Sequence, residues 1–268
     1  MRDSTEVSVA SDGKVAPDYK HALTALLLQM GDDELIFGHR CSEWLGLAPD
    51  LEEDIAFSSM AQDEIGHASL FYSIAESLSG TSADRYAFSR GKNSRLNAMM
   101  LETKNGDWAD TIVRSYLYNA FEQVRLKECL KSNFVSLQQA AAKILREERY
   151  HLLHMETWFE KLARSQGEAR QRLLRALQDI WPNISDLFDL GVHADSLVRH
   201  GIISNTSLGI YSQWESIVRP VFAKAAIDWP GKPVQFSQSG RVGQHTSAMD
   251  EILLTMTEVL SLDAQAVW

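Results

Sequence analysis

Apolar residues recur at helical intervals through most of the chain, in long stretches rich in Leu, Ala, Glu and Arg. Pro is rare, with 6 in 268 residues, and no clear run of alternating β-branched residues is present. The pattern predicts an all-α protein. The expected helices cover residues 18–45, 51–78, 108–131, 137–165, 168–187, 207–226 and 246–262.

The first four helices are expected to form a bundle of two helical hairpins, and the later ones are additional C-terminal helices. Pro49 and Asp50 mark the first tip, because Pro cannot sit inside a helix and Asp caps one. Asp50 and Glu53 make a variant of the capping box. Residues 131–136 mark the second tip. Asp107 is expected to cap the third helix, with Asp110 at its third position.

Two segments are expected to connect these helices, and the one over residues 89–107 is expected to be irregular. Residues 89–107 are rich in Gly, Asn, Ser and Lys, and residues 191–205 form a second connection. Pro182 and Pro220 are expected to kink or interrupt their helices. The basic stretch over 90–95 is interpreted as a solvated loop.

Length and composition favour one soluble domain over residues 18–268, preceded by a disordered polar arm over residues 1–17. The arm lacks the apolar core of a secretory signal, and no apolar run is long enough to span a membrane. A net charge of −10 disfavours nucleic acid as a partner. Cys41 and Cys129 make no metal or redox motif, so we expect buried thiols and a cytoplasmic location.

Two short motifs carry the same chemistry. Asp63-Glu64-Ile-Gly-His67 and Glu147-Glu148-Arg-Tyr-His151 are each an acid followed by Glu-x-x-His. Residues three apart share a helix face, so the Glu and His of each motif point into the same space. Two such motifs on facing helices, with one more Glu from each of two other helices, form the carboxylate cage for a pair of iron or manganese ions.

The spacing within each hairpin identifies the two remaining acids. Glu34 lies 15 residues before Pro49 and Glu64 lies 15 after it, so antiparallel helices bring them to one height. Glu122 and Glu148 each lie 13 residues from Val135. The predicted metal ligands are Glu34, Glu64, His67, Glu122, Glu148 and His151.

Four carboxylates and two imidazoles balance two divalent ions and leave room for dioxygen. Asp63 and Glu147 are expected to accept the proton on the other ring nitrogen of a ligand histidine. The alternative is that both motifs are solvated helix faces. Gly66 is expected to allow a close helix approach or to leave room for a substrate, and His154 is interpreted as structural.

Several motifs together resemble the phenylacetate-catabolism A/C family of ferritin-like proteins, and in particular its C-type subunits. The motifs cover nearly the whole chain beyond residue 17. They are Gly31-Asp-Asp-Glu-Leu, Gly38-His-Arg-x-Ser-Glu-Trp-Leu-Gly46, Ala48-Pro-Asp-Leu-Glu-Glu-Asp54, Ala61-Gln-Asp-Glu-Ile-Gly-His-Ala68, Asn105-Gly-Asp-Trp-Ala-Asp-Thr111, Glu148-Arg-Tyr-His151, Gly243-x-His-Thr246 and the terminal Trp268.

The resemblance implies a ferritin-like bundle and a place in a multicomponent monooxygenase that epoxidises phenylacetyl-CoA, an aromatic acyl-CoA. An A-type subunit would hold the working di-iron site and bind the thioester, a C-type subunit would pair with it as a scaffold, and a flavin and iron–sulfur reductase would supply electrons. A homo- or hetero-oligomer is therefore expected.

The sequence departs from the best-known C-type subunits, which have lost several metal ligands, because acids or imidazoles stand at all six expected positions. The first expectation is therefore a C-type subunit with a retained di-iron site, in which manganese could replace iron. The alternatives are a metal-free subunit that stabilises an A-type partner, a stand-alone di-iron or dimanganese oxygenase or oxidase, and an iron-handling protein.

Overall fold

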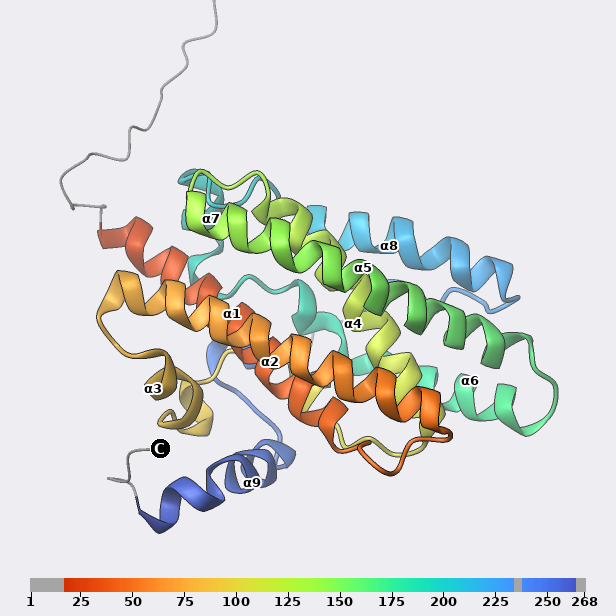
Figure 1. The fold of residues 1–268 in the computed structure, drawn as a ribbon. Coiled ribbons are helices and arrows are strands. Elements are labelled where there is room, and N and C mark those ends of the chain that lie inside the picture. The colour runs from red at the N-terminus through yellow and green to blue at the C-terminus, as the bar shows by residue number, and fades with distance from the viewer. Residues whose placement is uncertain (1–16, 234–237, 264–268) are drawn as a thin grey trace, which may run out of the picture.

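The computed structural model describes residues 17–233 and 238–263 of the chain. Every regular element within these residues is a helix, as the sequence predicts. The N-terminal arm expected over residues 1–17 lies outside the described residues, except for Pro17. The four longest helices form the bundle: α1 (Pro17–Ser42), α2 (Leu51–Ser79), α4 (Trp108–Cys129) and α5 (Val135–Arg164) (Figure 1).

The bundle consists of the two expected hairpins, α1 with α2 and α4 with α5. The predicted caps are confirmed. The Asp50 side chain accepts a hydrogen bond from the Glu53 backbone N–H at 2.9 Å, and Asp107 and Asp110 form a capping box at the start of α4. Gly80 ends α2 in the left-handed conformation, with φ of 80°, which a glycine adopts without strain.

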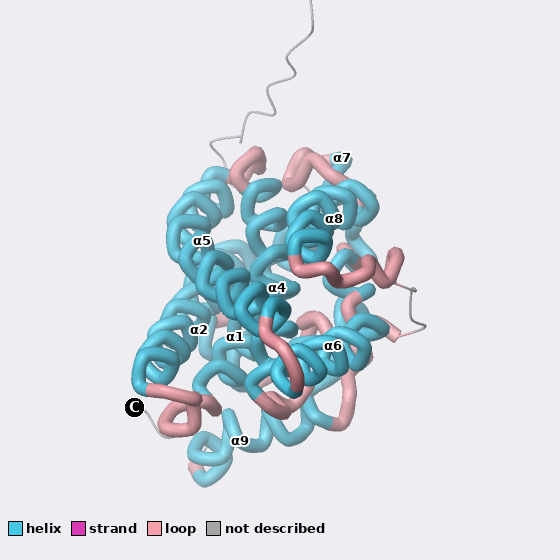
Figure 2. The backbone as a smooth tube through the Cα atoms, turned by 90° about the vertical axis from the view of Figure 1, so that its right-hand side faces the viewer, coloured by secondary structure: helices cyan, strands magenta, loops and turns pink. Residues whose placement is uncertain are grey.

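The additional helices α6 (Glu168–Ile180) and α8 (Ser207–Lys224) pack against α4. Figure 2 shows them beside α4, on the side of the bundle opposite α2. Trp214 of α8 is fully buried, and its indole N–H donates to the Leu117 carbonyl at 3.0 Å. The C-terminal hundred residues therefore complete the core around α4, nearly all of whose residues are buried.

The predicted helix over residues 168–187 is interrupted at Trp181 and Pro182, as expected. Helix α6 stops at Ile180, and 3-10 turns follow at Trp181–Asn183 and Ser185–Phe188. Pro182 causes the stop, because it lacks an N–H to continue the helical ladder. Pro220, in contrast, lies inside α8.

The expected connection over 191–205 leads to α8, and it also contains a 3-10 turn, Gly191–His193, and the short helix α7 (Ala194–Arg199), which the sequence did not predict. The region after α2 holds α3 (Ala83–Phe88) and the 3-10 turns Lys92–Ser94 and Met99–Glu102. Helix α9 (Ala248–Leu262) packs on these two turns, preceded by the 3-10 turn Gly240–Val242.

The basic stretch over 90–95 is only partly a solvated loop, because Gly91, Asn93 and Ser94 are exposed but the two arginines are not. Arg95 is fully buried, and Arg90 forms an ion pair with the buried carboxylate of Asp32 in α1. The two residues of that pair are 58 positions apart, so the local composition of the loop could not reveal the pairing. The two arginines therefore link α1 to the segment that follows α3 through the Asp32 carboxylate.

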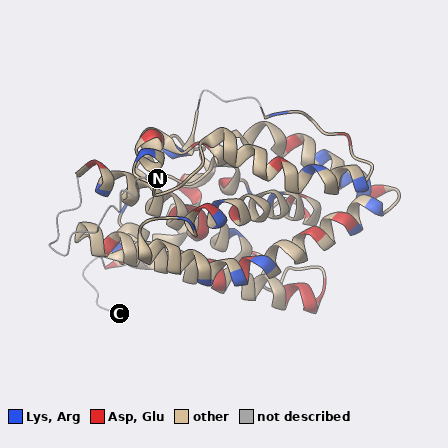
Figure 3. Cartoon of the chain, turned by 90° about the horizontal axis from the view of Figure 1, so that it is seen from above, with Lys and Arg blue, Asp and Glu red and all other residues tan. Residues whose placement is uncertain are grey.

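Charged residues are interspersed along the helices rather than gathered on one face (Figure 3). No described helix is both long and apolar enough to cross a membrane. Several acids instead lie in the interior, and three of them are consecutive in α1: Asp32, Asp33 and Glu34 are each fully buried.

Candidate metal centre

All six predicted ligands point into the bundle. The four glutamates are 0% exposed, His67 is 2% exposed and His151 is 5% exposed. They come from all four bundle helices: Glu34 from α1, Glu64 and His67 from α2, Glu122 from α4, and Glu148 and His151 from α5. The alternative of solvated helix faces is therefore wrong for these residues.

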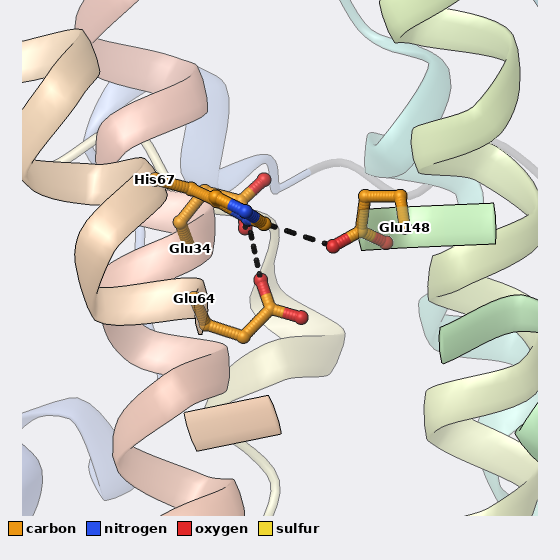
Figure 4. Close-up of side chains that lie close together, drawn as sticks. All are labelled: Glu34, Glu64, His67 and Glu148. Atoms are coloured by element: carbon orange, nitrogen blue, oxygen red, sulfur yellow. Dashed lines mark ion pairs between the residues drawn. The ribbon is translucent and has the colours of Figure 1, made fainter. Parts of the chain in front are cut away.

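Four of the six form a tight cluster of possible metal ligands. One ligand atom from each of Glu34, Glu64, His67 and Glu148 lies within 4.8 Å of the others. The Nδ1 atom of His67 lies 3.5 Å from Glu34 Oε2, 3.7 Å from Glu64 Oε2 and 3.6 Å from Glu148 Oε1. Figure 4 shows these side chains converging from α1, α2 and α5.

His151 borders this cluster from the α5 side. Its Nδ1 atom lies 2.9 Å from Glu148 Oε1 and 3.3 Å from Glu64 Oε1. The two histidine rings are 6.3 Å apart between centroids. Both Glu-x-x-His motifs thus present the same ring nitrogen, Nδ1, toward the same carboxylates.

The cluster contains buried polar atoms without a hydrogen-bond partner. They are both carboxylate oxygens of Glu64, Oε2 of Glu34, Oε2 of Glu148 and Nδ1 of His67. Burying such atoms unpaired is costly, and a cation among them would satisfy them together. Hard carboxylate oxygens and imidazole nitrogens are ligands that suit iron and manganese. These residues therefore fit a metal ion.

The two acids that precede the motif glutamates contact the histidines across the hairpins. Glu147 Oε2 of α5 lies 2.8 Å from His67 Nε2 of α2, and Asp63 Oδ2 of α2 lies 3.2 Å from His151 Nε2 of α5. Each carboxylate can accept the Nε2 proton, so that Nδ1, which faces the cluster, is the nitrogen available to a metal ion once its own proton is lost. Each motif thus orients the histidine of the other.

Glu122 stands apart from this cluster because an arginine binds it. Arg125, one turn later in α4, has Nη2 at 2.5 Å and Nε at 2.8 Å from Glu122 Oε2. The same guanidinium pairs with Asp33, and its Nη2 lies 3.7 Å from Glu34 Oε1. The centre therefore contains a fixed cation beside the acids, which was not among the residues predicted from the sequence.

Signals for Arg125 and Asp33 are nevertheless present in the sequence. Glu122-Gln-Val-Arg125 has the same spacing as Glu-x-x-His, so the arginine shares a helix face with Glu122. Asp33 belongs to a run of three acids between apolar stretches of a long helix. Such a run can remain buried only if its charges are paired.

The ionisation of the centre reflects burial and the crowding of charges. Burial and the neighbouring Glu64 raise the pKa of Glu34 to about 8. Burial also raises the pKa of Glu122 to about 8, although Arg125 opposes the shift. For His67, burial opposes the charged form, but Glu34 and Glu64 outweigh it and raise the pKa to about 12.

Burial also opposes the charged form of His151, but the neighbouring acids Glu148 and Glu64 outweigh it and raise the pKa of His151 to about 11. Without a metal, protons on these groups neutralise the cluster. Metal ligation requires unprotonated imidazoles and carboxylates, so a bound cation would replace those protons.

A surface groove of about 540 Å³ runs between α2 and α5 and opens beside the centre. Asp63, Glu147 and His151 line it, together with Tyr150 and His154. His154 pairs with Glu53 at 2.8 Å, in keeping with a structural role. The groove brings solvent to the acids that hold the histidines.

Gly38 is the glycine that allows α1 and α2 to approach each other at the centre. A Cβ atom at Gly38 would lie 2.9 Å from the Cβ of Glu64. Gly66, for which the sequence predicts this role, is exposed, and a Cβ atom added there would have no other atom within 4 Å. The expectation for Gly66 is therefore wrong with respect to helix approach.

Two comparisons with known proteins bear on the centre. The family model described as phenylacetic acid catabolic protein matches residues 6–268. The chain is 31% identical over 235 residues to the C subunit of 1,2-phenylacetyl-CoA epoxidase from Escherichia coli strain K12, and the match covers 87% of this chain and 94% of the relative. The resemblance inferred from the motifs is confirmed.

Proposed function

The chain belongs to the phenylacetic acid catabolic protein family, and from this premise we propose that it is the C-type subunit of a multicomponent phenylacetyl-CoA epoxidase with a metal centre of its own. The observation that supports a metal centre in this chain is the buried cluster of Glu34, Glu64, His67 and Glu148. The similarity to the Escherichia coli protein supports the assignment as a subunit, because it spans 94% of that relative.

The residues that would hold the metal are those of the cluster, with His151 beside them. Iron is the expected metal, and manganese accepts the same ligands. When bound, reduced iron would supply activation of dioxygen for transfer of one oxygen atom to an aromatic ring carried as its CoA thioester. A pair of ions would need Glu122 as well, and that carboxylate is bound to Arg125.

The protein would contribute orientation, proton placement and a dry interior. Glu147 and Asp63 would hold the Nε2 protons of His67 and His151, so that both Nδ1 atoms face the cluster as acceptors. Glu34, Glu64 and Glu148 are 0% exposed, so the surrounding protein would keep bulk water away from a metal ion bound between them. Electrons would come from a flavin and iron–sulfur reductase, and an A-type subunit would be the partner.

A second function is favoured by Arg125. A guanidinium bound to Glu122 and close to Glu34 neutralises buried acids without any metal. The chain would then be a metal-free structural subunit that stabilises a catalytic A-type partner. The two functions differ in whether the chain's own ligands matter for turnover.

Reconstitution separates these functions. The complex would be assembled from this chain, an A-type subunit and a reductase, and epoxide formation from phenylacetyl-CoA and NADPH would be measured. With Glu64→Gln in this chain, the metal-centre function predicts loss of the metal and a turnover at least tenfold lower. Unchanged turnover with Glu64→Gln, together with dependence on the presence of the chain, would establish the structural function. The matched control is Glu52→Gln, which changes an exposed acid of the same helix.

A further inference from the structure

The guanidinium of Arg125 occupies the side of the centre where Glu122 enters from α4. Glu122 Oε2 receives two of its N–H groups, from Nε at 2.8 Å and from Nη2 at 2.5 Å. Only Oε1 of Glu122 is left without a partner. The guanidinium therefore occupies one oxygen of Glu122 and fixes the orientation of this carboxylate, which leaves at most one oxygen for a metal ion.

Glu34 lies between Arg125 and the other members of the cluster. Its Oε2 faces His67 Nδ1 at 3.5 Å, whereas its Oε1 faces Arg125 Nη2 at 3.7 Å. The Tyr118 hydroxyl also donates toward Oε1, at 3.3 Å. The two oxygens of one carboxylate thus face two different positive groups, the metal position on one side and the arginine on the other.

Arg125 is fixed in place by contacts that do not involve the centre. Its Nη1 donates to Asp33, and Asp33 in turn accepts from Arg241 at 2.8 Å and from the Ala98 N–H at 2.8 Å. The guanidinium also stacks over Phe121, 5.0 Å from its ring centroid. Arg125 and Asp33 are buried, so these contacts are not screened by solvent.

An arginine keeps its charge under all ordinary conditions, unlike a lysine or histidine. It therefore neutralises Glu122 permanently and cannot leave the site by losing a proton. Three carboxylates, those of Glu34, Glu64 and Glu148, remain for a metal ion, with the imidazoles of His67 and His151. One divalent cation can take its ligands from this set alone, whereas a second would need a further carboxylate such as that of Glu122.

We propose that Arg125 takes the place of the second cation, so that the chain binds one divalent ion, at Glu34, Glu64, His67 and Glu148, and not two. The inference rests on the metal-binding function proposed above and specifies it. In this arrangement the metal ion is bound by the four-residue cluster, and Glu122 is bound by the guanidinium of Arg125. Arg241 ties the segment that precedes α9 to this arrangement through Asp33.

The test is the number of Mn²⁺ ions that the full chain binds. Metal-free protein is titrated with Mn²⁺ alone, the bound metal per chain is measured after gel filtration, and electron paramagnetic resonance distinguishes an isolated ion from a coupled pair. The wild type is expected to bind one ion with the signal of isolated Mn²⁺. Arg125→Gln is expected to bind two ions as a coupled pair, because Glu122 is then free to ligate.

The charge-balanced double variant Glu122→Gln/Arg125→Gln is the control for folding. It removes the ion pair as a unit and leaves the cluster intact, so one isolated ion is expected. Two ions in the wild type would overturn this inference while leaving the metal-binding function in place. No ion in the wild type would overturn both. One ion in Arg125→Gln, or two in the double variant, would contradict the role assigned to Arg125 and Glu122.

Discussion

The Oε2 atom of Glu147, in α5, lies 2.8 Å from Nε2 of His67, in α2, so one hairpin orients the histidine that the other contributes to the cluster. Asp63 and His151 repeat the contact in the opposite direction, at 3.2 Å. Both acids are partly exposed in the groove, at 38% and 39% of their side chains. They therefore form the link between the surface and the buried cluster.

Glu147→Gln and Asp63→Asn are each expected to weaken metal binding about 10–100-fold, because a neutral amide oxygen accepts the Nε2 proton less strongly than a carboxylate and makes the histidine a weaker ligand. Isothermal titration of metal-free protein with Mn²⁺ measures the change. Glu52→Gln, an exposed change in the same helix as Asp63, is expected to bind as the wild type does. Affinities of all three variants within about twofold of the wild type would refute this role.

Much of the centre could be predicted from the sequence, because helical spacing is local and regular. The distances along the chain from the hairpin tips place Glu34 level with Glu64, and both lie in the cluster. The Glu-x-x-His spacing places His67 and Glu148 there as well. The acid before each motif glutamate can also be identified in the sequence. The sequence does not show that this acid contacts the histidine of the opposite hairpin.

What could not be predicted depends on pairs that are distant in sequence. The spacing of Glu122 and Arg125 is visible in the sequence, but the position of the guanidinium also depends on Asp33, which lies 92 residues from Arg125 and accepts its Nη1 hydrogen bond. The burial of Arg95 depends in the same way on Asp32 in α1. Local composition describes a basic loop or a lone acid but does not identify the partner that compensates its burial.

Glu64→Gln is expected to abolish the stabilisation of the protein by metal. Neither oxygen of Glu64 has a hydrogen-bond partner, so the metal would be its main source of compensation. An ion present at about 100 times its dissociation constant stabilises the folded state by about 2.7 kcal/mol. Thermal unfolding with and without Mn²⁺ measures the difference. An equal rise in Tm for the wild type and Glu64→Gln would mean that the ion binds elsewhere.

Gly38→Ala is expected to destabilise the protein by about 1–3 kcal/mol, because the new methyl group would lie 2.9 Å from the Cβ of Glu64 and force α1 away from α2. The matched control is Gly66→Ala, in the same hairpin. Nothing lies within 4 Å of its added methyl group, so it is expected to stabilise α2 by up to about 1 kcal/mol. Urea unfolding of both variants checks the pair, and destabilisation of equal size would contradict the close-approach argument.

Glu128, at the end of α4, is expected to make stability depend on pH in acid. Burial opposes its ionisation, but hydrogen bonds from Lys131, Ser204, Gln213 and Asn205 outweigh burial and lower its pKa to about 2. The unfolded chain has the ordinary value of 4.5. The stabilisation is therefore fully present above pH of about 4.5 and is lost as the pH falls toward about 2.

Glu128→Gln is accordingly expected to lower the free energy of unfolding by about 1–3 kcal/mol at pH 7. The gap to the wild type should close between pH of about 4.5 and 2. Urea unfolding at pH 7, 4 and 3 measures it, with Glu52→Gln as the control. A gap that persists unchanged to pH 3 would show that the carboxylate charge is not its source.

The most direct measurement of the central claim is anomalous X-ray diffraction from crystals of the full chain grown with Mn²⁺. The account predicts one anomalous peak, within ligating distance of Glu34, Glu64, His67 and Glu148, with none beside the Arg125–Glu122 pair. The same peak should be absent from crystals of Glu64→Gln. A wild-type crystal with no peak among these four side chains would contradict the claim that they form a metal centre.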